Sequence, residues 1–155
     1  MIANDSDRAK PTVTKRKAAT GNTMASNTER AGKVVIVTGG TMGIGFGMAT
    51  RLAKYGASVV ITSRNSDSGA AALTRLREAA GCAPGNVAYL QMDISSEADN
   101  EGLVAFAVKT YGRLDAIINN AVHPGDFQLL ADESLESFER VMRTNVTGTY
   151  LGMRF

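Results

Sequence analysis

A glycine-rich segment that begins at Gly39 is the part of this sequence best suited to hold a phosphate chain. Four glycines fall within Gly39–Gly45, shortly after the apolar run Val34–Val37. Glycine lets the backbone turn tightly and approach an anion without a Cβ clash. The first amides of a following helix have no intrahelical partner and can point toward the same anion. The candidate phosphate ligands are therefore backbone groups of Gly39, Thr41, Met42, Gly43, Ile44 and Gly45.

Converging amides, rather than the helix dipole, would supply most of the binding energy of such a loop. The dipole contributes about 0.3 to 1 kcal/mol, whereas each hydrogen bond to a charged oxygen contributes about 1.5 to 3 kcal/mol. The spacing from Gly39 is G-x-x-x-G-x-G, which differs from the commonest dinucleotide fingerprint, G-x-G-x-x-G. A purely structural glycine turn is the alternative, and the flanking strand-like and helical patterns favour the dinucleotide site.

An arginine stands where many dinucleotide sites have an acidic residue. The apolar run Val59–Ile61 is followed by Thr62, Ser63 and Arg64, about 20 residues after the glycine loop. NAD sites usually offer Asp or Glu to the ribose hydroxyls at this point. The planar guanidinium of Arg64 instead suits a 2′-phosphate, so the sequence favours NADP(H) over NAD(H). A solvated loop arginine is the alternative.

Polar residues also follow the next two apolar runs. Asp93 and Ile94 follow one run, and Asp93 could accept a hydrogen bond from an adenine amino group or simply cap a helix. The segment Asn119–Ala121 follows the other run, and its two carboxamides could lock a loop. Asn145 falls within the last helical pattern, where a buried amide requires polar partners. A bend in that helix or a bound water would provide them.

The elements needed to position these residues alternate along the chain. Short apolar runs predict strands over 33–38, 58–62, 87–91 and 116–118. Apolar spacing predicts helices over 45–55, over 66–80, from about Ser95 to Gly112, and from near Asp132 or Ser134 to the end of the chain. This alternation is typical of βαβ units. We expect an α/β, Rossmann-like doubly wound parallel sheet that is incomplete, with about four strands, and ends within a helix.

Composition fits a single folded domain over residues 32–155. The chain has 155 residues, of which 44% are hydrophobic and 21% charged. Its apolar runs are too short for a membrane helix and its N-terminal residues lack a secretory pattern, so we expect a cytoplasmic protein without a membrane partner. The single cysteine, Cys82, excludes an internal disulfide and a cysteine-based metal cage, and we expect no metal.

The first 31 residues form a basic segment of different composition. They hold six lysines and arginines against three acids and show no hydrophobic periodicity, which predicts a disordered basic tail. Met24 is an alternative translational start. Nucleic-acid binding through the tail is disfavoured because basic residues there are not interleaved with aromatics.

Taken in order, these motifs resemble the short-chain dehydrogenase/reductase family over about Gly32–Phe155. The resemblance rests on the turn from Thr38 to Gly45, on Asp93, on Asn119–Ala121 and on Asn145. It implies a nicotinamide cofactor with Asn119 and Asn120 beside its ribose, and Asn145 in a catalytic proton relay. It also implies hydride transfer to or from a small carbonyl or alcohol substrate, and a homo-oligomer in which the helix bearing Asn145 packs against its copy. Val122 departs from the family, which usually has glycine there.

The family's catalytic tyrosine, followed four residues later by lysine, has no match in this chain. Tyr55, Tyr89, Tyr111 and Tyr150 are followed at that spacing by Val59, Asp93, Asp115 and Arg154. His123, the only histidine, is expected to be an exposed turn residue. The sequence therefore predicts the cofactor-binding half of an NADP(H)-dependent oxidoreductase that is inactive alone. The alternative is a non-catalytic nucleotide-binding or interaction module that pairs through its last helix.

Overall fold

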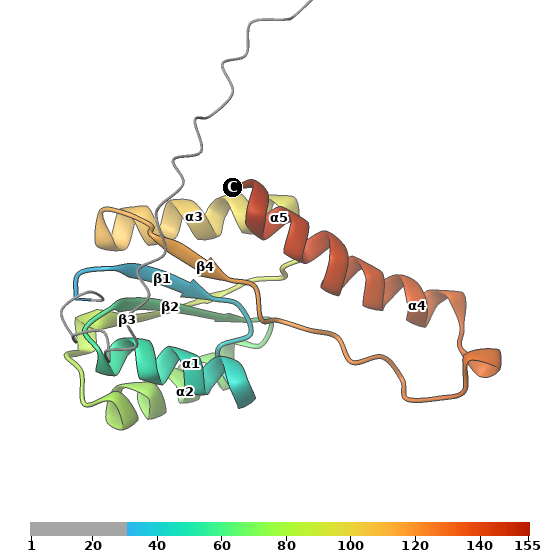
Figure 1. Cartoon of the computed structure of the whole chain (residues 1–155), viewed down its shortest axis with the longest axis horizontal. Coiled ribbons are helices and arrows are strands. Elements are labelled where there is room, and N and C mark those ends of the chain that lie inside the picture. Colours follow the sequence, from blue (N-terminus) through green and yellow to red (C-terminus); the bar gives the residue numbers. More distant parts are fainter. Residues whose placement is uncertain (1–30) are drawn as a thin grey trace, which may run out of the picture.

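A computed structural model describes residues 31–155 of the chain. The predicted basic tail therefore lies outside the described residues, apart from its last residue, and so does the alternative start at Met24. Within the described part the chain forms one sheet with helices on both faces (Figure 1). This arrangement confirms the predicted Rossmann-like class.

The sheet has four parallel strands in the order β3-β2-β1-β4. These are β1 (Val34–Val37), β2 (Ser58–Ser63), β3 (Val87–Gln91) and β4 (Ala116–Ile118). The register aligns Val37 with Ile61 and with Ile118, so the carboxyl ends of the strands meet at one edge. The chain runs outward from β1 in both directions, and ligands of open α/β sheets bind at such a reversal.

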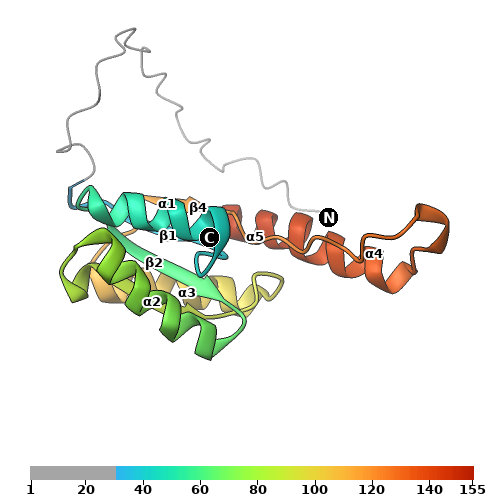
Figure 2. The same cartoon turned by 90° about the horizontal axis from the view of Figure 1, so that it is seen from below.

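Helices cover both faces of the sheet. Helices α1 (Gly43–Lys54) and α2 (Ser66–Ala80) lie on one face, and α3 (Glu97–Tyr111) and α5 (Gly148–Arg154) lie on the other (Figures 1 and 2). Alternate residues of β1 supply the two cores, because Val35 and Val37 face α1 and α2 whereas Val34 and Ile36 face α3. Short 3-10 turns precede β3 (η2, Pro84–Asn86) and α4 (η3, Leu130–Asp132).

The first helix begins two residues earlier than its apolar pattern predicts. It starts at Gly43 rather than Gly45 and ends at Lys54, and Tyr55 is its C-cap. Glycine is unfavourable in a helix interior, so the glycines near this end of α1 conceal where the helix begins. The second helix agrees with its prediction, and Ser96 caps the third through a hydrogen bond from the Asp99 amide of 3.2 Å.

The last predicted helix is divided by a π-helical turn. Helix α4 (Leu135–Met142) leads into the turn η4 (Arg143–Thr147), which leads into α5. The wider turn contains Asn145, whose backbone carbonyl accepts a hydrogen bond of 2.8 Å from the Thr149 hydroxyl. In Figure 1, α4 and the loop before it project beyond the carboxyl ends of the strands. Of the two alternatives expected at Asn145, a bend or a bound water, the structure shows a bend in the form of this π-helical turn.

Asp115 ties the beginning of β1 to the segment that leads into β4. Its carboxylate accepts hydrogen bonds from the Val34 amide (2.9 Å), Lys33 Nζ (3.0 Å) and Arg113 Nη2 (2.6 Å). Its own amide donates to the Val34 carbonyl at 2.9 Å. The hydrogen bond from Val34, with smaller contributions from Arg113 and Lys33, lowers the pKa of Asp115 from 3.8 to about 2.

We expect Asp115→Asn to lower the melting temperature at neutral pH. A carboxylate with a lowered pKa contributes stability above its unfolded value of 3.8, and this contribution is lost as the pH falls toward about 2. The difference in melting temperature between wild type and variant should therefore shrink over that range. Asp126→Asn is the matched control, since Asp126 contacts only the side chain of Arg140 at the surface. A pH-independent difference for Asp115→Asn would contradict the assignment.

Candidate functional site

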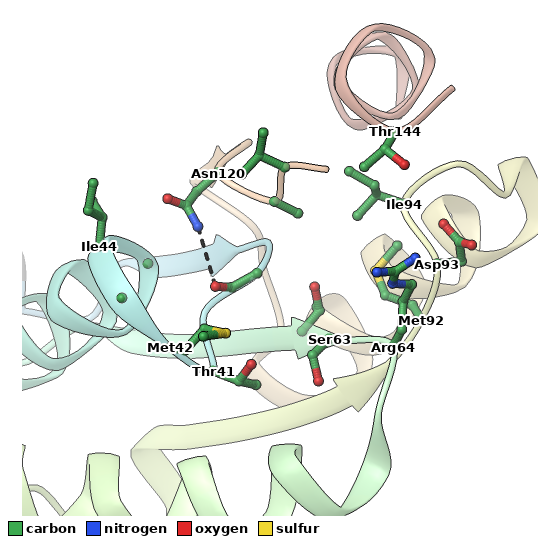
Figure 3. Close-up of a pocket in the computed structure, with 16 residues that line it drawn as sticks. Thr41, Met42, Ile44, Ser63, Arg64, Met92, Asp93, Ile94, Asn120 and Thr144 are labelled. Carbon is green, nitrogen blue, oxygen red and sulfur yellow. Dashed lines mark hydrogen bonds between the residues drawn. The ribbon is translucent and has the colours of Figure 1, made fainter. Parts of the chain in front are cut away.

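A pocket of about 350 Å³ opens at the carboxyl edge of the sheet, between the glycine loop, the ends of β2 and β3, and the π-helical turn (Figure 3). It brings together most of the residues predicted from the sequence, namely Gly39, Thr41, Met42, Gly43, Ile44, Gly45, Arg64, Asp93, Ile94, Asn120 and Ala121. Its remaining lining residues are Thr62, Ser63, Met92, Val122 and Thr144. The topology thus gathers segments that are distant in sequence.

The glycine loop is shaped by two close approaches of its backbone. Gly39 has φ 64°, and a Cβ there would lie 2.8 Å from the Ala121 Cα. A Cβ at Gly45 would overlap the side-chain amide of Asn120 and lie 2.5 Å from the Gly39 carbonyl oxygen. Both distances are shorter than real Cβ contacts allow, so only glycine fits at these two positions.

The start of α1 is open toward the pocket. Met42 is an extended N-cap without a side-chain hydrogen bond, and the first helical turn carries no acidic residue. The Phe46 amide donates to the Met42 carbonyl at 3.1 Å. The amides of Gly43, Ile44 and Gly45 therefore lack partners within the helix and are available to an anion.

Thr38 joins the end of β1 to the segment after β4. Its side chain is 2% exposed, and its hydroxyl donates to the Ile118 carbonyl at 3.3 Å. The same oxygen accepts from the amides of Asn120 (3.0 Å) and Ala121 (3.1 Å). Thr38 was not among the cofactor residues predicted from the sequence. The sequence feature that could have indicated its role is a threonine placed between the apolar run Val34–Val37 and the first glycine of the loop.

Asn120 completes this junction through its side chain. Its Nδ2 donates to the carbonyls of Thr38 (2.9 Å) and Gly39 (3.3 Å), and Figure 3 shows the amide turned toward the loop. Because both partners are backbone carbonyls, the Asn120 carboxamide holds the backbone of the loop in place and brings no charge to it. Asn120 is thus both a lining residue and a brace for the loop.

Two predicted residues, Asn119 and Asn145, do not line the pocket. Asn119 packs against α5, where a Cβ at Gly152 would overlap its Oδ1. Asn145 Oδ1 accepts from the His123 amide at 2.8 Å, and its Nδ2 donates to the His123 carbonyl at 3.0 Å. This pair of hydrogen bonds fastens the loop after β4 to the π-helical turn.

Asp93 lies at the opposite end of the pocket from the glycine loop. Its Oδ1 accepts from the Ser95 amide (2.9 Å) and the Ser95 hydroxyl (2.8 Å). Burial raises the pKa of Asp93, but these hydrogen bonds and the charges of Arg64 and Arg143 outweigh it, so the pKa lies below its usual value. Asp93 therefore stays ionised near neutral pH and turns the chain into α3.

The pocket also contains a buried hydroxyl without a hydrogen bond. Thr62 is 1% exposed, and its Oγ1 has no partner among residues 31–155. A buried polar atom is costly unless something completes it. This orphan hydroxyl and the cradle that a Cβ at Gly45 would fill both fit a polar, phosphate-bearing ligand such as a dinucleotide.

Residues 31–155 show neither a metal-binding cluster nor a membrane-spanning helix. Residues 31–155 contain no group of three or more His, Cys, Asp or Glu side chains placed to hold a metal ion. No helix in this range has the length and apolar character to span a bilayer.

His123, expected to be an exposed turn residue, is half-buried, and its Nδ1 accepts a hydrogen bond from the Gly125 amide at 3.1 Å.

Comparisons with known proteins agree with the family resemblance found in the sequence. The family model described as short chain dehydrogenase matches residues 33–155. A 2,5-dichloro-2,5-cyclohexadiene-1,4-diol dehydrogenase from Sphingobium indicum is 40% identical over 125 residues, which cover 81% of this chain and 47% of that protein. The chain thus spans about half the length of this curated relative.

Solved structures give the same result. A short chain dehydrogenase from Bacillus anthracis superposes with a TM-score of 0.75 at 34% identity, covering 81% of this chain and 50% of that one. An NAD+-bound xylitol dehydrogenase gives a TM-score of 0.74 at 31% identity, covering 81% of this chain and 47% of that one.

We expect Gly45→Ala to weaken NADPH binding by about 10-fold or more, because the added methyl displaces Asn120 and costs at least one charge-assisted hydrogen bond. Gly47→Ala is the control, since a Cβ at Gly47 meets nothing within 4 Å. It should keep the affinity and raise stability by up to about 1 kcal/mol. Calorimetric titration and thermal melting measure both effects. Equal affinity in the two variants would refute the proposed cradle.

Proposed function

The chain belongs to the short-chain dehydrogenase family, and on that premise we propose that it supplies the NADP(H)-binding part of an oxidoreductase. The substrate would be a small carbonyl or alcohol compound, and the nicotinamide, when bound, would supply or accept the hydride. The observation that carries this proposal is the glycine cradle at Gly39–Gly45, braced by Asn120 and open to the amides of α1. The cytoplasmic location predicted from the sequence belongs to the same proposal.

The choice of NADP(H) over NAD(H) rests on Arg64. Family membership leaves the choice open, since one solved relative is a xylitol dehydrogenase bound to NAD+. Arg64 lines the pocket at the end of β2, where its guanidinium is exposed and makes no hydrogen bond or ion pair among residues 31–155. A free guanidinium at this place supports recognition of a 2′-phosphate, which it can bind through two parallel hydrogen bonds.

Each predicted polar residue has a proposed part in holding the cofactor. The amides of Gly43–Gly45 would receive the diphosphate, and Asp93 and Ile94 would border the adenine. Asn119 and Asn120 would stand beside the ribose, with Asn120 also keeping the loop in shape. Asn145 would take part in a proton relay from the π-helical turn, where its side-chain amide is held by the backbone of His123.

We further propose that this chain binds the cofactor without appreciable turnover. None of its tyrosines is followed four residues later by a lysine. In a tyrosine and lysine pair, the cation stabilises the phenolate and lowers its pKa toward the working pH. Tyr150, on α5, is 55% exposed and lies outside the pocket, so it does not replace that pair.

Self-association through the last helices is a second proposal, supported by an apolar stripe. Along α4, the π-helical turn and α5, large apolar side chains remain exposed: Leu135, Phe138, Met142, Val146, Tyr150 and Met153. An apolar stripe of this extent marks an interaction surface. The stripe therefore supports the homo-oligomer expected from the family, and equally the alternative of a non-catalytic module that pairs through these helices.

Arg64→Gln should weaken NADPH binding by about 10-fold and leave NADH binding nearly unchanged, because only NADPH carries the 2′-phosphate. Titration calorimetry with each nucleotide measures the two affinities. Lys54→Gln at the exposed C-terminal end of α1 removes one positive charge away from the pocket and is the control. An equal loss for both nucleotides in Arg64→Gln would exclude a selective role for this arginine.

Light scattering coupled to size exclusion should show a dimer or larger species for the wild type. Phe138→Glu, which places a charge within the stripe where the side chain is 50% exposed, should shift the mass toward the monomer. Val108→Glu, at a 44% exposed position on α3, should not. A monomeric wild type at all concentrations would speak against pairing through these helices.

A further inference from the structure

A second arginine, Arg143, lies next to a residue that lines the pocket, although Arg143 is not itself part of the lining. Arg143 is the first residue of the π-helical turn and directly precedes Thr144, which lines the pocket beside Ile94 (Figure 3). Arg64 lines this corner of the pocket from the end of β2. The charges of both arginines act on the carboxylate of Asp93. Two elements far apart in the sequence therefore bring positive charge to one place.

The guanidinium of Arg143 is not used elsewhere in the fold. It is exposed and makes no hydrogen bond or ion pair among the residues that the structure describes, 31–155. Its neighbours on the same helical segment differ. Arg140 bonds Glu136 and Asp126 at 3.1 Å each, and Arg154 pairs with Glu97 at 2.8 Å. Arg143 alone among these three keeps its donors for a ligand.

The charge balance of the corner depends on Arg143. Two carboxylates stand there, because Asp99 accepts a hydrogen bond of 2.8 Å from the Asp93 amide. Arg64 alone would face both, and a 2′-phosphate adds about 1.5 to 2 further negative charges at pH 7. With Arg143 present, two cations balance the two carboxylates. The net negative charge that would repel the 2′-phosphate is then removed.

We propose that Arg143 is a selectivity residue that acts with Arg64 to favour a dinucleotide bearing a 2′-phosphate. The inference rests on the proposed NADP(H) function and extends it to a helix beyond the strand ends. Arg64 would bind the phosphate directly, and Arg143 would offset Asp93 and Asp99 across the pocket. Because Arg143 is exposed, its contribution falls as salt is added.

The test compares adenosine 2′,5′-bisphosphate with adenosine 5′-monophosphate, which differ only in the 2′-phosphate. Binding of each to the full chain is measured by calorimetry at low and at physiological ionic strength. Arg143→Gln should weaken the bisphosphate by about 3- to 10-fold at low salt and by less at physiological salt. It should leave the monophosphate unchanged, and Arg143→Lys should retain most of the selectivity.

Lys109→Gln is the control, since it removes one exposed positive charge from α3 at a distance from this pocket. Equal weakening of both nucleotides by Arg143→Gln would show that Arg143 only supports the fold around Thr144, and unchanged binding of both would exclude any role. Either result overturns this inference while the proposed function stands. A wild type that binds neither nucleotide would overturn both.

Discussion

The hydroxyl of Thr38 is the interaction on which the candidate site depends. It is held between the Ile118 carbonyl and the amides of Asn120 and Ala121, so it fixes the end of β1 against the segment after β4. Asn120 can then reach back to the carbonyls of Thr38 and Gly39. A buried network of this kind is stable only when every member is satisfied. The proposed phosphate cradle therefore depends on this junction between the two strand ends.

The two ends of the pocket differ in charge, with neutral groups at one end and charged groups at the other. At the glycine loop the proposed binding groups are backbone amides, next to the close fit of Gly45 against Asn120. At the other end, Asp93, Arg64 and Arg143 provide charges whose interactions weaken as salt is added. Recognition of the diphosphate should therefore be robust, whereas the choice between nucleotides rests on exposed side chains.

The parts of the fold that the sequence predicts are those governed by local patterns. The strands follow from short apolar runs, and α2 follows from the helical spacing of its apolar residues. In the structure Gly81 ends α2 in the left-handed conformation. A bend at Asn145 was one expectation, but the partner of its side chain could not be predicted, since Asn145 hydrogen-bonds to His123, 22 residues away in sequence. The pocket lining was largely predictable because strand ends in a parallel sheet share one edge. The placement of Asn119 against Gly152 could not be predicted, because it depends on where α5 runs relative to the sheet.

The central claim is that the amides at the start of α1 hold the diphosphate of a nicotinamide nucleotide. Amide resonances of the uniformly ¹⁵N-labelled chain, followed by NMR during titration with NADPH, test it most directly. The account predicts that the largest shifts fall on Gly43, Ile44 and Gly45, and that exchange of these amides with solvent slows on binding. Binding that leaves these three resonances unmoved, or the absence of any binding by a folded chain, would contradict it.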